Sequence, residues 1–393
     1  MKPTRQFDRS RRAFVATGIA AGSGALAGCL GGDSGPESSR DSYTVSMAPM
    51  GEIPFDAVPE NAFVSFTQYA DMAVALGHGD TVRTLFAPEM SGTTMNGFYE
   101  RLEGVSFDWK GLTNPLQGGV TKEQLYSAES DVHFLDPSYV LTTQPDWDES
   151  DIEEIADTVG PWVGSYHSGV HSDPAETYAD SYEYYTLWEL FENVAAVFRE
   201  RNRYEALAEV YDETRSQIES ALPPEHERPT VARVTLDADN GVFYAYHLNT
   251  PGFWQAETRP LGARDALADV AWSGDWGEIS YETMLEADPD VILHLWGITS
   301  RYAIGDIRAQ LAADAAGSEL TAVRNDRVFA SGMRYQGPLM NLFQLEMTAK
   351  QLYPEQFGEW PGSQPGEPYP SIPTAEQLFD RQRVATIVTD GVE

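Results

Sequence analysis

The chain has 393 residues, of which 42% are hydrophobic, with 26 basic and 61 acidic side chains and a formal net charge of −35. This length and hydrophobic content predict a large core and two domains with appendages. The acidic excess argues against nucleic acid as a partner. Only four lysines occur, and an acidic, lysine-poor composition is typical of adaptation to high salt, although an acidic protein from ordinary salt is the alternative.

Residues 1–29 have the pattern of an export signal. A twin-arginine motif at Arg11 and Arg12 precedes a weakly apolar run, residues 13–28, that is too short to span a bilayer. Leu26-Ala27-Gly28-Cys29 is similar to the lipobox of lipoproteins, so we expect Cys29 to carry a lipid on the outer face of the cell membrane. An uncleaved membrane anchor is the alternative. Cleavage would change the net charge from −35 to −39, because residues 1–28 carry a net +4.

Residues 30–44 form a polar tether, and residues 45–173 then alternate between strand and helix patterns. This alternation predicts an N-terminal α/β lobe with a largely parallel sheet. The expected strands are residues 62–66, 81–86 and 131–135, and the expected helices are residues 69–76, 123–128 and 152–159.

Residues 174–224 are predicted to be helical, in two runs that lie side by side. In the second run, Asn202–Leu222, apolar side chains recur at helical spacing, Pro223 and Pro224 supply a stop, and Asn202 with Glu205 forms a capping-box pattern. At 1.5 Å per residue this helix would be roughly 30 Å long. We interpret it as a spine that joins two lobes, the alternative being an ordinary core helix of one domain.

Residues 225–393 predict a C-terminal α/β lobe with a tail. The expected strands are residues 230–236, 241–247, 290–296 and 327–330. The expected helices are residues 261–269, 304–315, 338–352 and 374–384, the last of which follows a proline-rich stretch.

A ten-residue pattern occurs once in each predicted lobe. Glu123 to Val132 aligns with Glu282 to Val291, and in both copies a glutamate in the first turn of a short helix stands eight residues before an aspartate that leads into a strand. A carboxylate near a helix N-terminus is favoured by the helix dipole by roughly 0.3 to 1 kcal/mol, which gives a purely structural explanation for the glutamates.

With these repeats, the chain resembles the solute-binding proteins of ABC importers for iron-siderophores, haem and cobalamin over most of residues 45–358. The resemblance also rests on three further motifs, Ala75-Leu76-Gly77 with Asp80-Thr81-Val82, Ala287–Ile292, and Leu352–Phe357. Asp71 and Ser130 depart from the residues common in that family. The resemblance implies two Rossmann-like lobes with largely parallel sheets joined by one long α-helix, a ligand in the cleft between them, little hinge motion and a monomer.

In that family one surface glutamate per lobe docks onto arginines of the permease dimer, and Glu123 and Glu282 match those positions. Two such charges, one on each lobe, suit recognition of a two-fold symmetric partner.

The ligand pocket is expected beyond the carboxyl ends of the predicted strands. Aromatic rings there can stack on a flat or apolar ligand, and an arginine can hold carboxylate or hydroxamate oxygens. These residues suit a bulky metal chelate, most simply a ferric siderophore, with cobalamin or haem as the alternative. Individually each of them could instead be a core or surface residue. The candidates are Tyr69, Trp162, Tyr166, His167, Trp254, Trp296, Arg334 and Tyr335.

Direct metal binding and catalysis have weaker sequence support. His167 and His171 have the spacing of shared helical ligands, but Gly169 lies between them and the other histidines are scattered, so loop or surface roles fit better. No nucleotide-binding glycine motif or Gly-x-Ser-x-Gly nucleophile motif occurs. We therefore expect a binding protein with no cofactor, no catalytic residues and no bare metal site; a bare-metal-binding protein or a metal-dependent enzyme on this architecture is the alternative.

Overall fold

The computed structural model describes residues 42–364 and 367–392, and these residues form one compact unit. The predicted export signal, Cys29 and the tether up to residue 41 lie outside the described residues. Within the described part of the chain, no helix has the length and apolar character needed to cross a membrane. The predicted division into lobes at 45–173, 174–224 and 225–393 stays a prediction.

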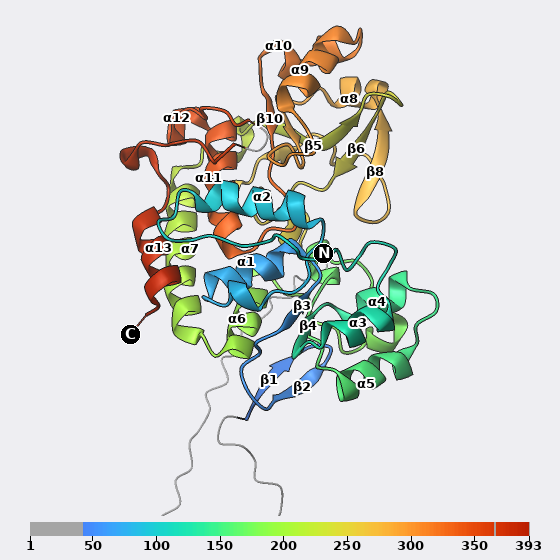
Figure 1. Cartoon of the computed structure of the whole chain (residues 1–393). Coiled ribbons are helices and arrows are strands. Elements are labelled where there is room, and N and C mark those ends of the chain that lie inside the picture. Colours follow the sequence, from blue (N-terminus) through green and yellow to red (C-terminus); the bar gives the residue numbers. More distant parts are fainter. Residues whose placement is uncertain (1–41, 365–366, 393) are drawn as a thin grey trace, which may run out of the picture. The chain divides into compact units, whose positions relative to one another are not determined.

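Within the described residues, the strands form three sheets. Their bounds are β1 (Tyr43–Met47), β2 (Gly51–Phe55), β3 (Ala62–Val64), β4 (Val132–Phe134), β5 (Thr230–Asp237), β6 (Val242–Tyr246), β7 (Arg264–Asp265), β8 (Trp276–Ser280), β9 (Val291–His294) and β10 (Val328–Ala330). β1 and β2 make an antiparallel hairpin, and β3 pairs in parallel with β4. The six-stranded sheet has the order β10-β9-β5-β6-β8, with β7 beside β5 (Figure 1). Its β10-β9, β9-β5 and β5-β7 pairs are parallel, whereas β6 and β8 add antiparallel pairs.

Helices flank these sheets, which confirms the predicted mixed α/β class. Their bounds are α1 (Thr67–Ala75), α2 (Pro88–Tyr99), α3 (Lys122–Ala128), α4 (Pro137–Thr143), α5 (Glu149–Thr158), α6 (Leu187–Phe198), α7 (Arg201–Ala221), α8 (Tyr281–Ala287), α9 (Ile304–Ala313), α10 (Thr321–Arg324), α11 (Pro338–Leu352), α12 (Pro354–Phe357) and α13 (Arg381–Asp390).

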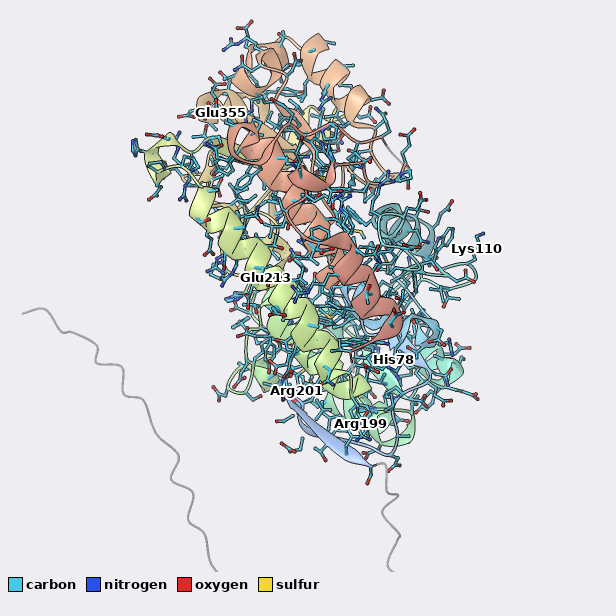
Figure 2. All side chains as sticks on the ribbon, turned by 90° about the vertical axis from the view of Figure 1, so that its left-hand side faces the viewer. His78, Lys110, Arg199, Arg201, Glu213 and Glu355 are labelled. Atoms are coloured by element: carbon cyan, nitrogen blue, oxygen red, sulfur yellow. The ribbon has the colours of Figure 1, made fainter. Side chains whose placement is uncertain are left out.

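The long helix predicted near the middle of the chain is α7, with 21 residues. Its apolar stripe is buried at Leu207, Val210, Thr214 and Ile218, and it lies beside α6, where the rings of Trp188 and Tyr211 stack 4.4 Å apart. Figure 2 shows α7 running from Arg201 past Glu213, with the C-terminal helices alongside. The helix ends at the double proline as predicted.

The predicted capping box at Asn202 is wrong, because α7 begins at Arg201 and its N-cap is Glu200, which makes no side-chain capping bond. Glu200 takes this place because α6 ends immediately before it, with Arg199 in the left-handed conformation.

Other boundaries also differ from the predictions. Residues 81–86 make only isolated bridges instead of a strand, at Val82 and Thr84. The helix predicted over 261–269 is a 3₁₀ turn followed by the short strand β7, because the segment pairs with β5. The C-terminal helix starts at Arg381, where Asp380 supplies an N-cap side chain.

The repeated sequence pattern folds into the same local structure twice. α3 and α8 each have seven residues, a hydroxyl N-cap (Thr121 or Ser280), and an acidic C-cap in the left-handed conformation. After each helix, an aspartate carboxylate accepts hydrogen bonds from the start of the neighbouring strand. Asp131 binds the N–H groups of residues 60 and 61 at 2.9 and 2.8 Å, and Asp290 binds both the N–H and the hydroxyl of Thr230 at 2.8 Å. We call Asp131 and Asp290 the anchor aspartates; they tie helix, strand and sheet together in both copies.

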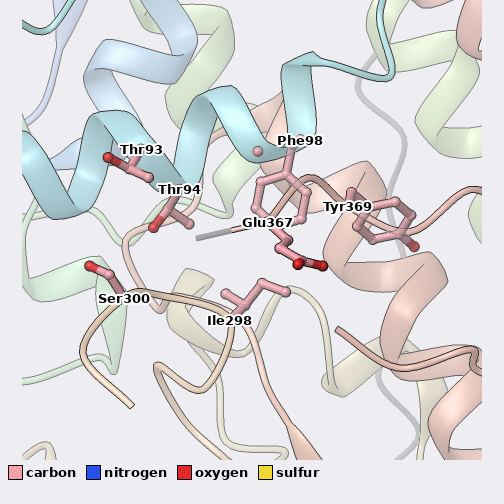
Figure 3. A pocket seen from close by; sticks show the side chains of 8 residues that line it. Thr93, Thr94, Phe98, Ile298, Ser300, Glu367 and Tyr369 are labelled. Carbon is pink, nitrogen blue, oxygen red and sulfur yellow. The ribbon is translucent and has the colours of Figure 1, made fainter. Parts of the chain in front are cut away.

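The C-terminal segment after residue 358 connects several elements. Tyr369 is buried, its N–H donates to the carbonyl of Gly97 in α2, and its hydroxyl donates to Glu346 in α11. α13 then packs against α7. A small cavity of about 10 Å³ remains where α2, residues 298–300 and this segment meet (Figure 3), which is room for about one water molecule.

Candidate functional site

Side chains from segments that follow several strands meet in one aromatic cluster, which we define as Phe66, Phe86, Tyr139, Tyr166, Trp254, Trp296 and Tyr335. Phe66 follows β3, Trp296 follows β9 and Tyr335 follows β10, while Trp254 comes from the segment after β6. The cluster therefore draws on strands of two different sheets. This is the arrangement expected of ligand sites in open α/β folds.

Tyr335 is the centre of the aromatic cluster. Its ring centroid lies 4.7 Å from that of Phe66, 5.6 Å from Trp254 and 5.5 Å from Trp296. Tyr166 extends the cluster, at 5.2 Å from Trp254 and 4.4 Å from Tyr139. Most of these pairs are tilted or edge-to-face, which is a favourable geometry for aromatic rings.

Arg334 adds a cation to the aromatic cluster. Its guanidinium carbon lies 4.2 Å from the ring centroid of Trp254 and 4.9 Å from that of Tyr335, and one terminal nitrogen donates to the Tyr335 hydroxyl at 2.8 Å. Burial opposes the charge, but the neighbouring Tyr335, Tyr166 and Asp275 raise the pKa of Arg334 overall. Arginine stays protonated in any case, so the cluster contains a permanent positive charge.

Three buried polar atoms around the aromatic cluster have no hydrogen-bond partner among the described residues. They are Nε of Arg334, Nε1 of Trp254 and Nε2 of His167. Buried polar groups are nearly always paired, because an unpaired one costs about 1 to 3 kcal/mol. These three atoms therefore leave hydrogen-bonding capacity at the cluster that a ligand could use.

A polar network positions the loop that carries Tyr166 and His167. The buried Asp136 carboxylate accepts hydrogen bonds from the Tyr166 N–H at 2.7 Å and from the Tyr182 hydroxyl. Burial raises the pKa of Asp136, although these bonds oppose the shift. Burial also lowers the pKa of His167, whose Nδ1 lies 2.9 Å from the Ser172 hydroxyl. His167 is therefore a neutral imidazole near pH 7.

A second buried network links the segment of Trp254 to the helices behind it. Arg233 and Glu257 form an ion pair with side chains 1% and 0% exposed. Gln336 donates to Glu257 and accepts from Asn341, whose amide oxygen accepts from the indole of Trp188 in α6 at 3.3 Å. Because each link joins a different element, this network holds the position of residues 253–257 relative to α11 and α6.

Six of the eight predicted pocket residues come together, namely Tyr166, His167, Trp254, Trp296, Arg334 and Tyr335. Tyr69 lies in the core instead, stacked 5.7 Å from Phe134, and its hydroxyl accepts from the Ser165 N–H. Trp162 also lies away from the cluster, where its indole donates to the carbonyl of Ile152 at 3.0 Å.

The predicted site residues did not include Phe66, Phe86, Tyr139 or Asp275. Phe66 and Tyr139 stand at or a few residues beyond the ends of predicted strands, so the strand-end rule could have included them. Asp275, whose carboxylate lies 3.5 Å from Arg334, belongs to an irregular loop and carried no such signal.

The two repeat glutamates occupy equivalent, exposed positions. Glu123 is in the first turn of α3 and Glu282 is in the first turn of α8. Neither forms an ion pair with any of the described residues. Their carboxylates are thus free to meet a cationic partner.

Comparison with known proteins gives the fold a family. The family model for periplasmic binding proteins matches residues 67–335. No curated protein sequence matches the chain.

Similar solved structures include a periplasmic binding protein from Veillonella parvula, with 14% identity, a TM-score of 0.56, and coverage of 79% of this chain and 97% of that one. Another is molybdate-bound MolA from Haemophilus influenzae, with 19% identity, a TM-score of 0.52, and coverage of 78% of this chain and 90% of that one. A third is PiuA, an iron uptake ABC transporter substrate-binding protein from Streptococcus pneumoniae, with 16% identity, a TM-score of 0.51, and coverage of 77% of this chain and 96% of that one. At these identities the structures show a shared fold. The match over residues 67–335, more than half of the sequence, shows that this chain belongs to the family of extracytoplasmic periplasmic binding proteins.

Proposed function

We propose that this protein is the substrate-binding receptor of an ABC importer and that it binds a ferric siderophore at the aromatic cluster. The observation that carries the proposal is the meeting of Arg334 with the rings of Trp254 and Tyr335, in a cluster that Phe66 joins from a strand of a second sheet. The rings offer stacking surface to a bulky organic ligand, and the guanidinium offers donors to its oxygens. Cobalamin and haem are alternative ligands with large planar rings.

Binding of such a ligand requires movement at the cluster. The rings of Phe66 and Tyr335 are in direct contact, with centroids 4.7 Å apart, so a chelate that enters between them must separate them. The energetic cost is modest, because each aromatic pair contributes about 0.5 to 1.5 kcal/mol beyond its buried area. Ligand stacking and the pairing of the three unpaired polar atoms would offset it.

The proposal extends to the protein's surroundings. Cys29 would carry the lipid anchor, the monomeric receptor would stand on the outer face of the membrane, and Glu123 and Glu282 would present it to the permease dimer. The exposed, unpaired state of both glutamates supports this role, and the net charge of −35 supports a high-salt habitat.

A titration of the mature protein in molar salt tests the ligand assignment. Tryptophan fluorescence would be followed against a ferric hydroxamate, a ferric catecholate, cobalamin, haem and free zinc. We expect saturable binding of one chelate, weakened about 10- to 100-fold by Arg334→Met, because a hydrogen bond to a charged group contributes about 1.5 to 3 kcal/mol.

Arg383→Met is the matched control, since Arg383 is partly exposed on α13 and pairs only with Glu209 and Glu213 among the described residues. It should leave the affinity unchanged. Binding of zinc alone, or equal affinities of the Arg334 variant and the unmodified protein for every chelate, would contradict the proposal.

A further inference from the structure

Asp275 is an acidic side chain inside the candidate site that the proposed function leaves without a role. Its carboxylate lies 3.5 Å from a terminal nitrogen of Arg334, and the two side chains are 25% and 15% exposed. This distance is at the long limit of a hydrogen bond. Arg334 also has its Nε unpaired among the described residues, so the contact leaves donor capacity unused.

The loop that carries Asp275 is fastened on both sides. Trp272 stacks on His247 with ring centroids 4.8 Å apart, and its side chain lies against Gly277, where an added Cβ would be only 2.5 Å from it. Immediately after Asp275, β8 begins and pairs with β6. The carboxylate is therefore held in place beside Arg334 by packing and by the sheet.

Two pairs of opposite charges lie at or behind the aromatic cluster, Arg334 with Asp275 and Arg233 with Glu257. Tyr139 and Tyr166 have raised pKa values because of burial, and His167 has a lowered one, so these three are neutral near pH 7. Asp136 is buried, with its own hydrogen bonds to Tyr182 and to the loop backbone.

Screening by salt determines which charges of the protein can act on a bound ligand. In molar salt the Debye length is about 3 Å, so the exposed acidic surface is screened from the site. A buried or half-buried charge is screened much less. Asp275 can therefore repel an anionic ligand in molar salt, whereas the exposed acidic side chains on the protein surface cannot.

We propose that Asp275 is a specificity-determining counter-ion, which makes the site select a metal chelate that is uncharged or cationic over one that is polyanionic. The inference rests on the proposed function and deepens it by stating the charge class of the ligand. Arg334 then serves a neutral ligand as a donor of hydrogen bonds, while its charge is balanced by the protein itself.

The test compares two ferric chelates, an uncharged trihydroxamate and a tris-catecholate of charge 3−, in molar salt. The unmodified protein should bind the uncharged chelate more tightly. Asp275→Asn, which keeps the size of the side chain, should strengthen binding of the trianion by about tenfold or more, because it removes a partly buried negative charge that repels the chelate at short range. Affinity for the uncharged chelate should change less than about threefold. Glu103→Gln removes an exposed carboxylate and should change neither affinity.

Several outcomes would overturn the inference: tighter binding of the trianion by the unmodified protein, equal changes for both chelates in Asp275→Asn, or no change for either. Equal losses would mean that Asp275 only braces Arg334.

Iodide quenching provides a readout that needs no chelate. If the folded protein binds neither chelate, the proposed function fails, and the counter-ion role can still be judged. The comparison is made in a Trp276→Phe background, because Trp276 adjoins Asp275 and is 49% exposed, whereas Trp254 and Trp296 are 1% and 8% exposed. There, iodide quenching of tryptophan fluorescence, relative to quenching by neutral acrylamide, should rise in Asp275→Asn and not in Glu103→Gln, because Trp296 is the partly accessible ring of the cluster and packs on Tyr335, the partner of Arg334. An unchanged ratio in Asp275→Asn would refute the counter-ion role.

Discussion

Replacing Arg381 with methionine should destabilise the protein far more than the same change two residues later at Arg383. Arg381 is 9% exposed and pairs at 2.7 Å with Glu346, which is fully buried. Its guanidinium also lies over the rings of Phe343, Tyr369 and Phe379, at 5.2 to 5.7 Å. Without Arg381, the Glu346 carboxylate would keep only the Tyr369 hydroxyl and the Leu378 N–H as partners among the described residues.

The expected magnitudes differ because of burial. Removing one partner of a buried ion pair costs about 3 to 5 kcal/mol, since the other charge stays buried without compensation. Arg383 is 35% exposed, and its partners Glu209 and Glu213 are 64% and 62% exposed. Loss of such a surface pair costs about 0 to 1 kcal/mol, and molar salt screens it further.

Urea unfolding in molar salt, followed by tryptophan fluorescence, measures both free energies of unfolding. A double variant, Arg381→Met with Glu346→Gln, should recover much of the loss because the remaining partner is no longer charged. If Arg381→Met lost less than about 1 kcal/mol, or no more than Arg383→Met, the reasoning from burial would be wrong.

Three further predictions follow from buried or exposed carboxylates. Burial raises the pKa of Asp71 to about 7 from 3.8, so between these pH values the unfolded chain releases a proton that the folded protein keeps. This difference should lower the free energy of unfolding by up to about 4 kcal/mol as the pH rises through this window. Urea unfolding at about pH 4.5 and 8 measures the fall, which should be smaller in Asp71→Asn. An equal fall in Asp71→Asn and in the unmodified protein would count against this prediction. Asp131→Ala and Asp290→Ala should each lower the free energy of unfolding by about 1 to 3 kcal/mol in the same assay. The two losses should add in the double variant, because the two anchor aspartates belong to different sheets. Strong non-additivity would contradict this and show that the two aspartates are coupled. Charge reversal at Glu123 and Glu282 together should abolish uptake in cells and leave chelate affinity intact, and normal uptake would exclude the docking role.

The parts of the fold that the sequence predicted well are those with a long local pattern. The stripe of Leu207, Val210, Thr214 and Ile218 identified α7, and residues 338–352 form α11 with the predicted bounds. The segment over 261–269 was mistaken for a helix because its pairing with β5 is a tertiary contact, which no local periodicity contains.

The prediction of site residues was limited for the same reason, because side-chain contacts between distant segments are absent from the local sequence pattern. The strand-end rule locates the backbone but not the side to which a side chain points. Trp162 pairs through an isolated bridge with His133 and turns toward α5, and Tyr69 turns into the core from the first turn of α1. Asp275 reaches Arg334 only through the fold of the chain between β7 and β8, so sequence position gave no indication of it.

The anchor aspartates have a consequence for how this surface can evolve. They hold α3 and α8 through hydrogen bonds to main-chain N–H groups and to a single threonine hydroxyl, Thr230. Main-chain groups are present whatever side chain a residue carries. Substitutions on the outer faces of these two helices can therefore accumulate without displacing the helices. The partner-binding surface can change during evolution while the fold stays the same.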